Sequence, residues 1–297
     1  MTELSDVGDD SLGRGRPPCG TRTLEHRLAL LNAELAAVPG VLVAFSGGVD
    51  SGVVLAAAVR ALGTDRVVAA TAVSASLPAA ERAAAHEFAV GLGVRHEQPR
   101  TDELARPGYV ANAGDRCSFC KSELVEVLAP LAAGLGIADV VTGTNADDLR
   151  AGFRPGIRAA AERGAWAPLA RAGMTKDDVR AAARRWGLSL ADKPAAACLA
   201  SRITYGVPVT AAGLARVERA EAGLRAALTA AGLPVRNLRV RDMGEDVARV
   251  EVDVALVSDV SPDLLAAVTG FARVELDPRG FRSGAMNELL PDPVRYR

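Results

Sequence analysis

The sequence predicts an α/β protein in which a doubly wound parallel sheet is followed by a smaller C-terminal α+β domain. Short apolar runs alternate with helical patterns through the first two thirds of the chain, which is typical of parallel βαβ units. From Thr210 onward, a long helical pattern and two alternating strands replace this arrangement. At 297 residues the chain is long enough for two domains with buried cores.

The parallel sheet is expected from four short apolar segments that helical patterns separate. The predicted strands are residues 41–45, 67–72, 94–97 and 138–142. The predicted helices are residues 53–59, 79–92, 124–135 and 176–186. Thr175, with Asp178 three residues later, approximates a capping box at the start of the last helix.

The C-terminal region is expected to combine helices with a β-hairpin. Its predicted elements are a helix at 210–231, strands at 237–243 and 247–253, a short helix from 262 and a strand at 273–276. Ser261 and Pro262 have the residue types that begin a helix. A boundary near residues 206–210 gives predicted domains of residues 23–206 and 207–297.

Composition argues against several classes of function. The net charge of −1 disfavours a broad nucleic-acid surface, which is usually strongly basic. No apolar run reaches the roughly 18 residues of a membrane span, and residues 1–22 predict a disordered tail rather than a secretory signal. Four cysteines in a chain of this length do not form a disulfide framework. A cytoplasmic protein is therefore expected, with metal-binding or catalytic thiols.

The turn after the first strand has the composition of an anion-binding loop, Ser46-Gly47-Gly48-Val49-Asp50-Ser51. Its glycines let backbone amides approach a ligand, and its serines add hydroxyl groups. The N-terminus of the next helix favours an anion such as pyrophosphate. Asp50 would repel phosphate unless a cation lay between them, which points to Mg²⁺. The plainer alternative is a glycine-rich turn that binds nothing.

This loop resembles the PP-loop of N-type ATP pyrophosphatases, which have an adenine nucleotide alpha hydrolase-like fold. It lacks the Gly-Lys-Ser/Thr of a Walker loop. The resemblance implies that ATP is cleaved to AMP and pyrophosphate while a substrate is adenylylated, with Asp50 as a catalytic residue. The groups implied to bind pyrophosphate and Mg²⁺ are Ser46, Gly47, Gly48, Asp50 and Ser51. From topology, residues 44–46 and 71–74 are the candidates for adenine and ribose contacts.

Three internal cysteines form a second candidate site. Cys117 and Cys120 make a C-x-x-C unit, and Cys198 lies far along the chain. A structural zinc site needs four ligands, and a fourth is missing unless Cys19 of the tail contributes. Three thiolates can instead hold three irons of a [4Fe–4S] cluster and leave the fourth iron open. Unrelated thiols are the plainer alternative.

Several further segments resemble signatures of the LarE family. They are residues 143–148, 154–156, 167–169, 175–176, 192–202, 205–206 and 282–287. The resemblance implies an ATP-dependent sulfur insertase of nickel-pincer nucleotide biosynthesis. Its substrate would be pyridinium-3,5-biscarboxylic acid mononucleotide, whose carboxylates become thiocarboxylates. The family also suggests a homo-oligomer, namely a hexameric ring.

The same resemblance makes Cys198 the residue that delivers sulfur. In one route, Cys198 attacks the acyl-adenylate and loses its sulfur, which leaves dehydroalanine in the chain. In the other, Cys117, Cys120 and Cys198 ligate a [4Fe–4S] cluster that carries an additional sulfide. Some family members have only the equivalent of Cys198, whereas this chain has all three cysteines, so the cluster route is favoured.

A pair of arginines in the predicted hairpin is the candidate phosphate site. Arg239 and Arg241 alternate with apolar residues, so they share one face of the strand. A solvated strand face is the plainer interpretation. The LarE resemblance instead places the substrate phosphate against these arginines, whose fork geometry suits phosphate, with Glu221 as a polar neighbour.

Two other functions compete with sulfur insertion into a small nucleotide. A tRNA 2-thiolation enzyme of the PP-loop superfamily would use the same loop and cysteines, but the near-neutral charge and the lack of a basic, aromatic-rich extension argue against RNA. A non-catalytic nucleotide-binding module would keep the loop, but Asp50 and three internal cysteines argue against it. The expected partner is therefore a small-molecule nucleotide, with no nucleic acid and no membrane.

Overall fold

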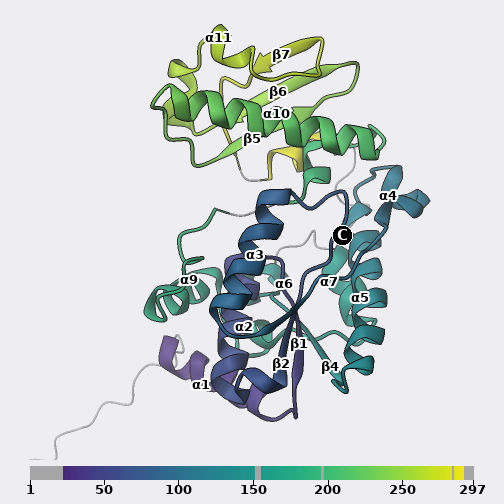
Figure 1. Ribbon diagram of the computed structural model, residues 1–297, viewed down its shortest axis with the longest axis vertical. Coiled ribbons are helices and arrows are strands. Elements are labelled where there is room, and N and C mark those ends of the chain that lie inside the picture. Colours follow the sequence, from purple (N-terminus) through teal and green to yellow (C-terminus); the bar gives the residue numbers. More distant parts are fainter. Residues whose placement is uncertain (1–22, 151–154, 195–196, 283, 291–297) are drawn as a thin grey trace, which may run out of the picture.

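The structure is a computed structural model that describes residues 23–150, 155–194, 197–282 and 284–290 (Figure 1). The predicted disordered tail, with Cys19, lies outside the described residues. So do residues 154, 195–196 and 283 of the segments that resemble the LarE signatures.

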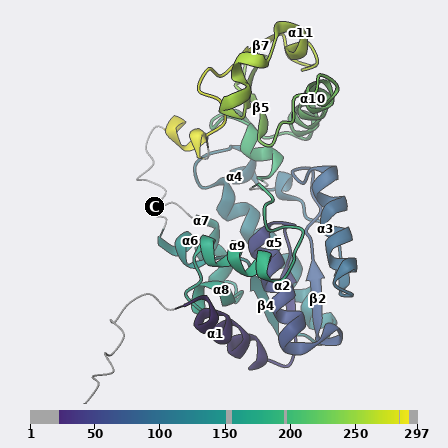
Figure 2. The same ribbon diagram turned by 90° about the vertical axis from the view of Figure 1, so that its left-hand side faces the viewer.

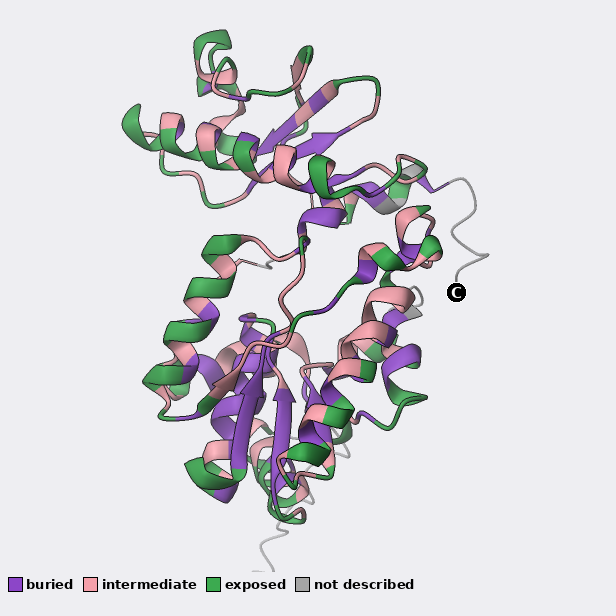
Figure 3. Cartoon of the chain, turned by 45° about the vertical axis from the view of Figure 1, so that its right-hand side comes forward, coloured by how far each residue is buried: buried purple, intermediate pink, exposed green. Residues whose placement is uncertain are grey.

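A four-stranded parallel sheet forms the lower part of the molecule in Figure 1, as the sequence predicts. In the order β3-β2-β1-β4, its strands are β1 (Val41–Ala44), β2 (Val67–Ala70), β3 (Arg95–Glu97) and β4 (Asp139–Thr142). The central strand β1 pairs in register with both β2 and β4. Nearly all residues of β1 and β2 are buried, because helices cover both faces (Figure 3).

The two faces of this sheet carry separate hydrophobic cores. One core packs under α1 (Leu24–Ala36), α2 (Val49–Leu62), α3 (Ala79–Gly91), α8 (Pro168–Arg171) and α9 (Lys176–Arg185). The other packs under α5 (Arg116–Gly134) and α7 (Pro155–Ala161). The doubly wound arrangement is thus confirmed. The capping box predicted at Thr175 and Asp178 is also present at the start of α9.

Helix α5 begins at Arg116, well before the predicted start at residue 124. Its first two turns therefore contain Cys117 and Cys120. Apolar spacing did not reveal these turns, because the residues that they bury are the polar Arg116 and Ser122. The C-x-x-C unit is consequently helical, with its two thiols about one turn apart.

The C-terminal unit is the upper part of Figure 1 and contains a mixed sheet of order β5-β6-β7. Its elements are α10 (Ala211–Ala230), β5 (Leu238–Asp242), β6 (Val247–Val252), α11 (Pro262–Leu265) and β7 (Arg273–Leu276). The hairpin β5–β6 is antiparallel, and β7 pairs with β6 in parallel. Helix α10 covers one face of this sheet (Figure 2). Thr210 and Ser261 cap α10 and α11 as predicted.

The segment that follows Cys198 packs between the two units. Its short 3-10 helix η3 (Leu199–Arg202) and Ile203 share a hydrophobic cluster with Tyr109 on one side and Leu214 of α10 on the other. Asn112 donates from its side-chain amide to the carbonyl of Thr204 at 2.8 Å. A domain boundary at residues 206–207 remains a prediction. Within the described residues, no helix combines the length and apolar character needed to cross a bilayer.

Candidate functional site

The serine–glycine loop, residues 46–51, lies at the carboxyl end of β1, where Gly48 is the N-cap of α2. Its own hydroxyl groups hold it. Ser51 Oγ donates to the Gly48 carbonyl at 3.2 Å and accepts from the Ser46 amide at 3.2 Å. Gly47 has a φ of +71°, which favours glycine, and a Cβ there would lie 3.3 Å from the Ala85 Cβ. The loop therefore presents the first turn of α2 at the edge of the sheet.

The end of β4 approaches this loop at Gly143. A Cβ at Gly143 would lie 2.6 Å from the Ser51 nitrogen and 2.9 Å from the Ser51 Cα. Both atoms belong to backbone, which cannot rotate away. We expect Gly143→Ala to displace the first turn of α2 and to reduce the free energy of unfolding by about 1–3 kcal/mol, as overpacking does.

Urea denaturation followed by circular dichroism measures this change. Gly91→Ala is the matched control, because a Cβ at the end of α3 would meet no atom within 4 Å and Gly91 has no positive φ. That control should be neutral or stabilising by up to about 1 kcal/mol. A Gly143→Ala protein as stable as the Gly91→Ala protein would show that the loop yields freely.

Asp50 is the charged residue of the loop, and side chains from the segments after β4 hold it. Lys176 Nζ lies 2.5 Å from Asp50 Oδ2, and Asn145 Nδ2 lies 3.1 Å from Oδ1. Asp147 accepts from the Lys176 amide at 2.8 Å, so it orders the segment that carries the lysine. The sequence argument placed a cation beside Asp50, and the chain itself supplies one. Sequence reasoning assigned no role to Asn145 or Lys176, although both lie in segments that it singled out.

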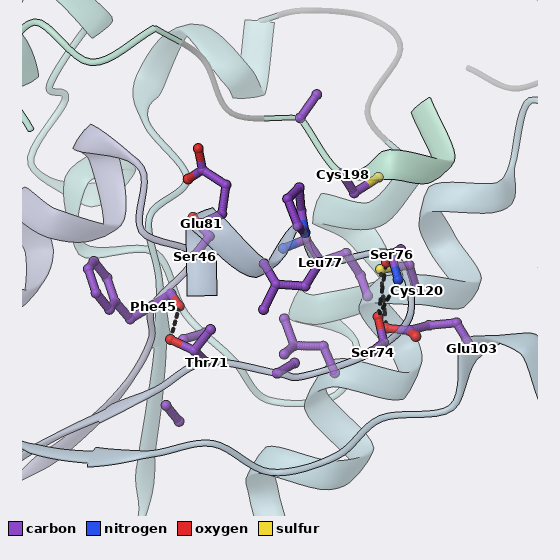
Figure 4. A pocket seen from close by; sticks show the side chains of 17 residues that line it. Phe45, Ser46, Thr71, Ser74, Ser76, Leu77, Glu81, Glu103, Cys120 and Cys198 are labelled. Carbon is purple, nitrogen blue, oxygen red and sulfur yellow. Dashed lines mark hydrogen bonds between the residues drawn. The ribbon is translucent and has the colours of Figure 1, made fainter. Parts of the chain in front are cut away.

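A cavity of about 190 Å³ opens beside the loop at the carboxyl ends of the strands (Figure 4). Its walls include residues 44–46 and 70–72 with Ser74, so the segments expected to contact adenine and ribose meet here. Thr71 Oγ1 donates to the Phe45 carbonyl at 2.7 Å and joins the ends of β1 and β2. This is the edge at which open parallel sheets bind ligands.

Thiols lie at the other end of the same cavity. Cys120 and Cys198 line it, as does Lys121 (Figure 4). Burial, followed by the nearby Cys198 thiol, raises the pKa of Cys120 to about 12. Cys117 is exposed, one turn before Cys120. Among the described residues, no three His, Cys, Asp or Glu side chains are close enough to hold a single metal ion.

Arg116 is a buried cation beside these thiols that sequence reasoning missed. Its guanidinium donates to the Asn112 side-chain oxygen and, at 2.8 Å, to the Ala200 carbonyl. Burial acts to lower the pKa of Arg116, but the neighbouring Cys198 and Cys117 raise it overall. The guanidinium thus interacts with both thiols, which places cysteines from two distant segments around one positive charge. Its only sequence signal is its position directly before Cys117.

The main chain of Cys198 is held by charged side chains. Arg202 donates to the Cys198 carbonyl at 3.0 Å and also to the Ala197 carbonyl. Glu221 of α10 receives Arg202 at 2.8 and 3.1 Å. The next residue, Leu199, donates its amide to the Ser76 carbonyl at 2.8 Å. The C-terminal unit therefore helps to position the candidate sulfur-bearing residue.

A second, basic cavity of about 530 Å³ lies between the two units and adjoins the first. Its charged lining consists of Glu81, Lys193, Arg202, Glu218, Glu221, Arg225, Arg236 and Arg239. Pro78, Glu81 and Ala197 line both cavities, so the two meet at the residue that precedes Cys198.

The two predicted phosphate arginines differ in their surroundings. Arg239 lines the basic cavity, and burial, followed by the charge of Arg202, lowers its pKa to about 10. Arg241 instead makes a two-pronged ion pair with Glu251 at 2.6 and 2.7 Å. The solvated strand face that the sequence left open is wrong, because every residue of β5 is buried. The segment around η3 covers this face, since Arg241 also donates to the Ser201 carbonyl.

Fold and site together define a Rossmann-like α/β protein with a ligand cavity at the carboxyl edge of its sheet, bordered by thiols. No family model matches the chain. An uncharacterised protein of Synechocystis sp. is 42% identical over 274 residues, which cover 90% of this chain and 99% of that protein. The pyridinium-3,5-bisthiocarboxylic acid mononucleotide synthase of Lactiplantibacillus plantarum is 35% identical over 275 residues, with 90% of this chain and 96% of that protein covered.

This identity over nearly the whole length of both proteins shows the family. The chain belongs to the family of pyridinium-3,5-bisthiocarboxylic acid mononucleotide synthases, the LarE family.

Proposed function

We propose that this protein is an ATP-dependent sulfur insertase whose substrate is pyridinium-3,5-biscarboxylic acid mononucleotide. The observation that carries the proposal is that one cavity is lined by both the serine–glycine loop and Cys198, and that a basic cavity meets it at Ala197. The name of the relative from Lactiplantibacillus plantarum supports a bisthiocarboxylic acid mononucleotide as the product.

The loop acts as a PP-loop in this proposal. The first turn of α2 and the hydroxyls of Ser46 and Ser51 receive the pyrophosphate part of ATP, and adenine lies along residues 44–46 and 71–74. Asp50 and these hydroxyls are oxygen ligands of the kind that Mg²⁺ prefers, and the ion would offset charge on the leaving pyrophosphate. Lys176 and Asn145 keep the Asp50 carboxylate oriented toward the phosphates.

The substrate occupies the basic cavity, with its phosphate against Arg239. A substrate carboxylate oxygen attacks the α-phosphorus of ATP, and pyrophosphate leaves. A sulfur nucleophile from the Cys198 side then attacks the acyl carbon and displaces AMP. Adenylylation is required because a free carboxylate is a poor electrophile, and a thiolate is a strong nucleophile. Glu221 holds Arg202 and thereby the Cys198 backbone between the two cavities.

The three cysteines fit a [4Fe–4S] cluster by donor type, because thiolates are its usual ligands and Arg116 offsets negative charge. Ligands of a cluster stand farther apart than those of one ion, since each binds a different iron. Cys117, Cys120 and Cys198 would hold the cluster, which would supply an open iron for a transferable sulfide.

The decisive experiment measures pyrophosphate release from ATP by anaerobically purified protein with the pyridinium mononucleotide, with bulk tRNA, or with neither. We expect release with the mononucleotide alone, together with a thiocarboxylate product detected by mass spectrometry. Release with tRNA alone would favour tRNA thiolation, and release with neither would favour a nucleotide-binding module. Iron and sulfide analysis of the same sample tests the cluster.

A further inference from the structure

Glu81 stands at the boundary of the two cavities and was not singled out by its sequence. It lies in the first turn of α3, and it lines both the cavity beside the loop and the basic cavity. Its Oε2 is 2.6 Å from Lys193 Nζ. Figure 4 shows Glu81 beside Ser46, at the opposite end of the cavity from Cys120.

Lys193 connects this boundary to the serine–glycine loop. Besides its ion pair with Glu81, its ammonium group donates to the Gly47 carbonyl at 2.9 Å. Both side chains are largely shielded, with 18% of Lys193 and 26% of Glu81 exposed. One ammonium group therefore joins the loop, α3 and the segment that leads to Cys198.

The main chain of Lys193 is fixed independently of this ion pair. Arg180 of α9 donates to the Ala191 carbonyl at 2.7 Å and to the Lys193 carbonyl at 3.3 Å. The four-carbon stem remains the adjustable part, and a lysine side chain has many rotamers. Without Glu81, the ammonium could turn toward Glu218 or Glu221, which line the basic cavity. Glu81 thus selects the rotamer that points at the loop.

A carboxylate at this boundary is otherwise unfavourable for the proposed reaction. Adenylylation brings two anions together: the substrate carboxylate forms a bond to the α-phosphorus while the bond to the pyrophosphate oxygen breaks. Glu81 alone would repel both anions. Its presence is understandable if its task is to hold a cation between them, where a fixed charge stabilises the transition state more than a mobile one.

We propose that Glu81 is a positioning residue that holds the Lys193 ammonium between the ATP α-phosphate and the substrate carboxylate. This inference rests on the proposed function, and it extends it by assigning a residue outside the loop and the thiol group.

The test compares Glu81→Gln, Glu81→Asp, Lys193→Gln and the double Gln variant in pyrophosphate–ATP exchange driven by the pyridinium mononucleotide. Lys193→Gln should lower kcat by about 100-fold, as loss of a transition-state charge does. Glu81→Gln should lower kcat by about 10-fold with KM for ATP nearly unchanged, and Glu81→Asp should recover most of that loss. The double variant should be no worse than Lys193→Gln, because the two residues act as one unit.

Glu25→Gln is the matched control, since it removes the exposed ion pair with Arg185 far from both cavities. It should leave exchange unchanged. Multiplicative losses in the double variant, or wild-type kcat in Glu81→Gln, would overturn the role of Glu81. A fall in Tm by more than about 4 °C with equal loss of ATP binding would assign Glu81 a merely structural role. No exchange by the wild-type protein would overturn the proposed function itself.

Discussion

Cys198→Ser is expected to abolish thiocarboxylate formation, by at least about 10³-fold, while pyrophosphate–ATP exchange stays within a few-fold of wild type. Cys198 lies at the thiol end of the cavity, whereas the loop that would bind phosphate lies at its other end. A hydroxyl is nearly the size of a thiol but is a far weaker nucleophile and a poor iron ligand. The substitution therefore separates the two halves of the reaction. Exchange and product mass, measured on one sample, test this separation.

Cys117→Ser and Cys120→Ser serve as companion variants that distinguish the two sulfur routes. In the cluster route, both lose iron and thiocarboxylate formation together. In the sacrificial route, both retain a single turnover, and the protein loses the mass of one sulfur at Cys198. Thiocarboxylate formation by Cys198→Ser at the wild-type rate would contradict both routes, because it would remove Cys198 from sulfur delivery.

The fold was predictable from sequence wherever local pattern and tertiary packing agree. Buried parallel strands are continuous apolar runs, so β1, β2 and β4 were found with ends within two residues. Caps at Thr175, Thr210 and Ser261 are local hydrogen-bond motifs and were equally visible. The start of α5 was missed because its buried side chains are polar, and their burial depends on distant segments such as residues 199–203.

The candidate site divides along the same line. The loop at 46–51 and the cysteine spacing are short patterns, and sequence located them. The Lys176–Asp50 and Lys193–Glu81 pairs join residues more than one hundred positions apart, so no local pattern contains them. Arg239 and Arg241 looked equivalent because strand alternation reports only the shared face. It does not report what covers that face, and Glu251 and η3 make the two arginines different.

Arg241→Ala is accordingly expected to act on stability, with a loss of roughly 3–5 kcal/mol in the free energy of unfolding. Its partner Glu251 is 4% exposed, so removing the arginine would leave a buried carboxylate without its counter-charge. Arg239→Ala should instead weaken substrate binding, because Arg239 lines the basic cavity. Urea denaturation and calorimetric titration with the pyridinium mononucleotide separate the two effects.

The double variant Arg241→Met with Glu251→Leu provides the sharper control. Replacing both members of a buried ion pair by apolar residues is often nearly neutral, since no charge is left uncompensated. We therefore expect this double variant to regain most of the stability that Arg241→Ala loses, and to bind the mononucleotide with near wild-type affinity. If it folds well but no longer binds, Arg241 contacts the substrate directly and its pairing with Glu251 must open on binding.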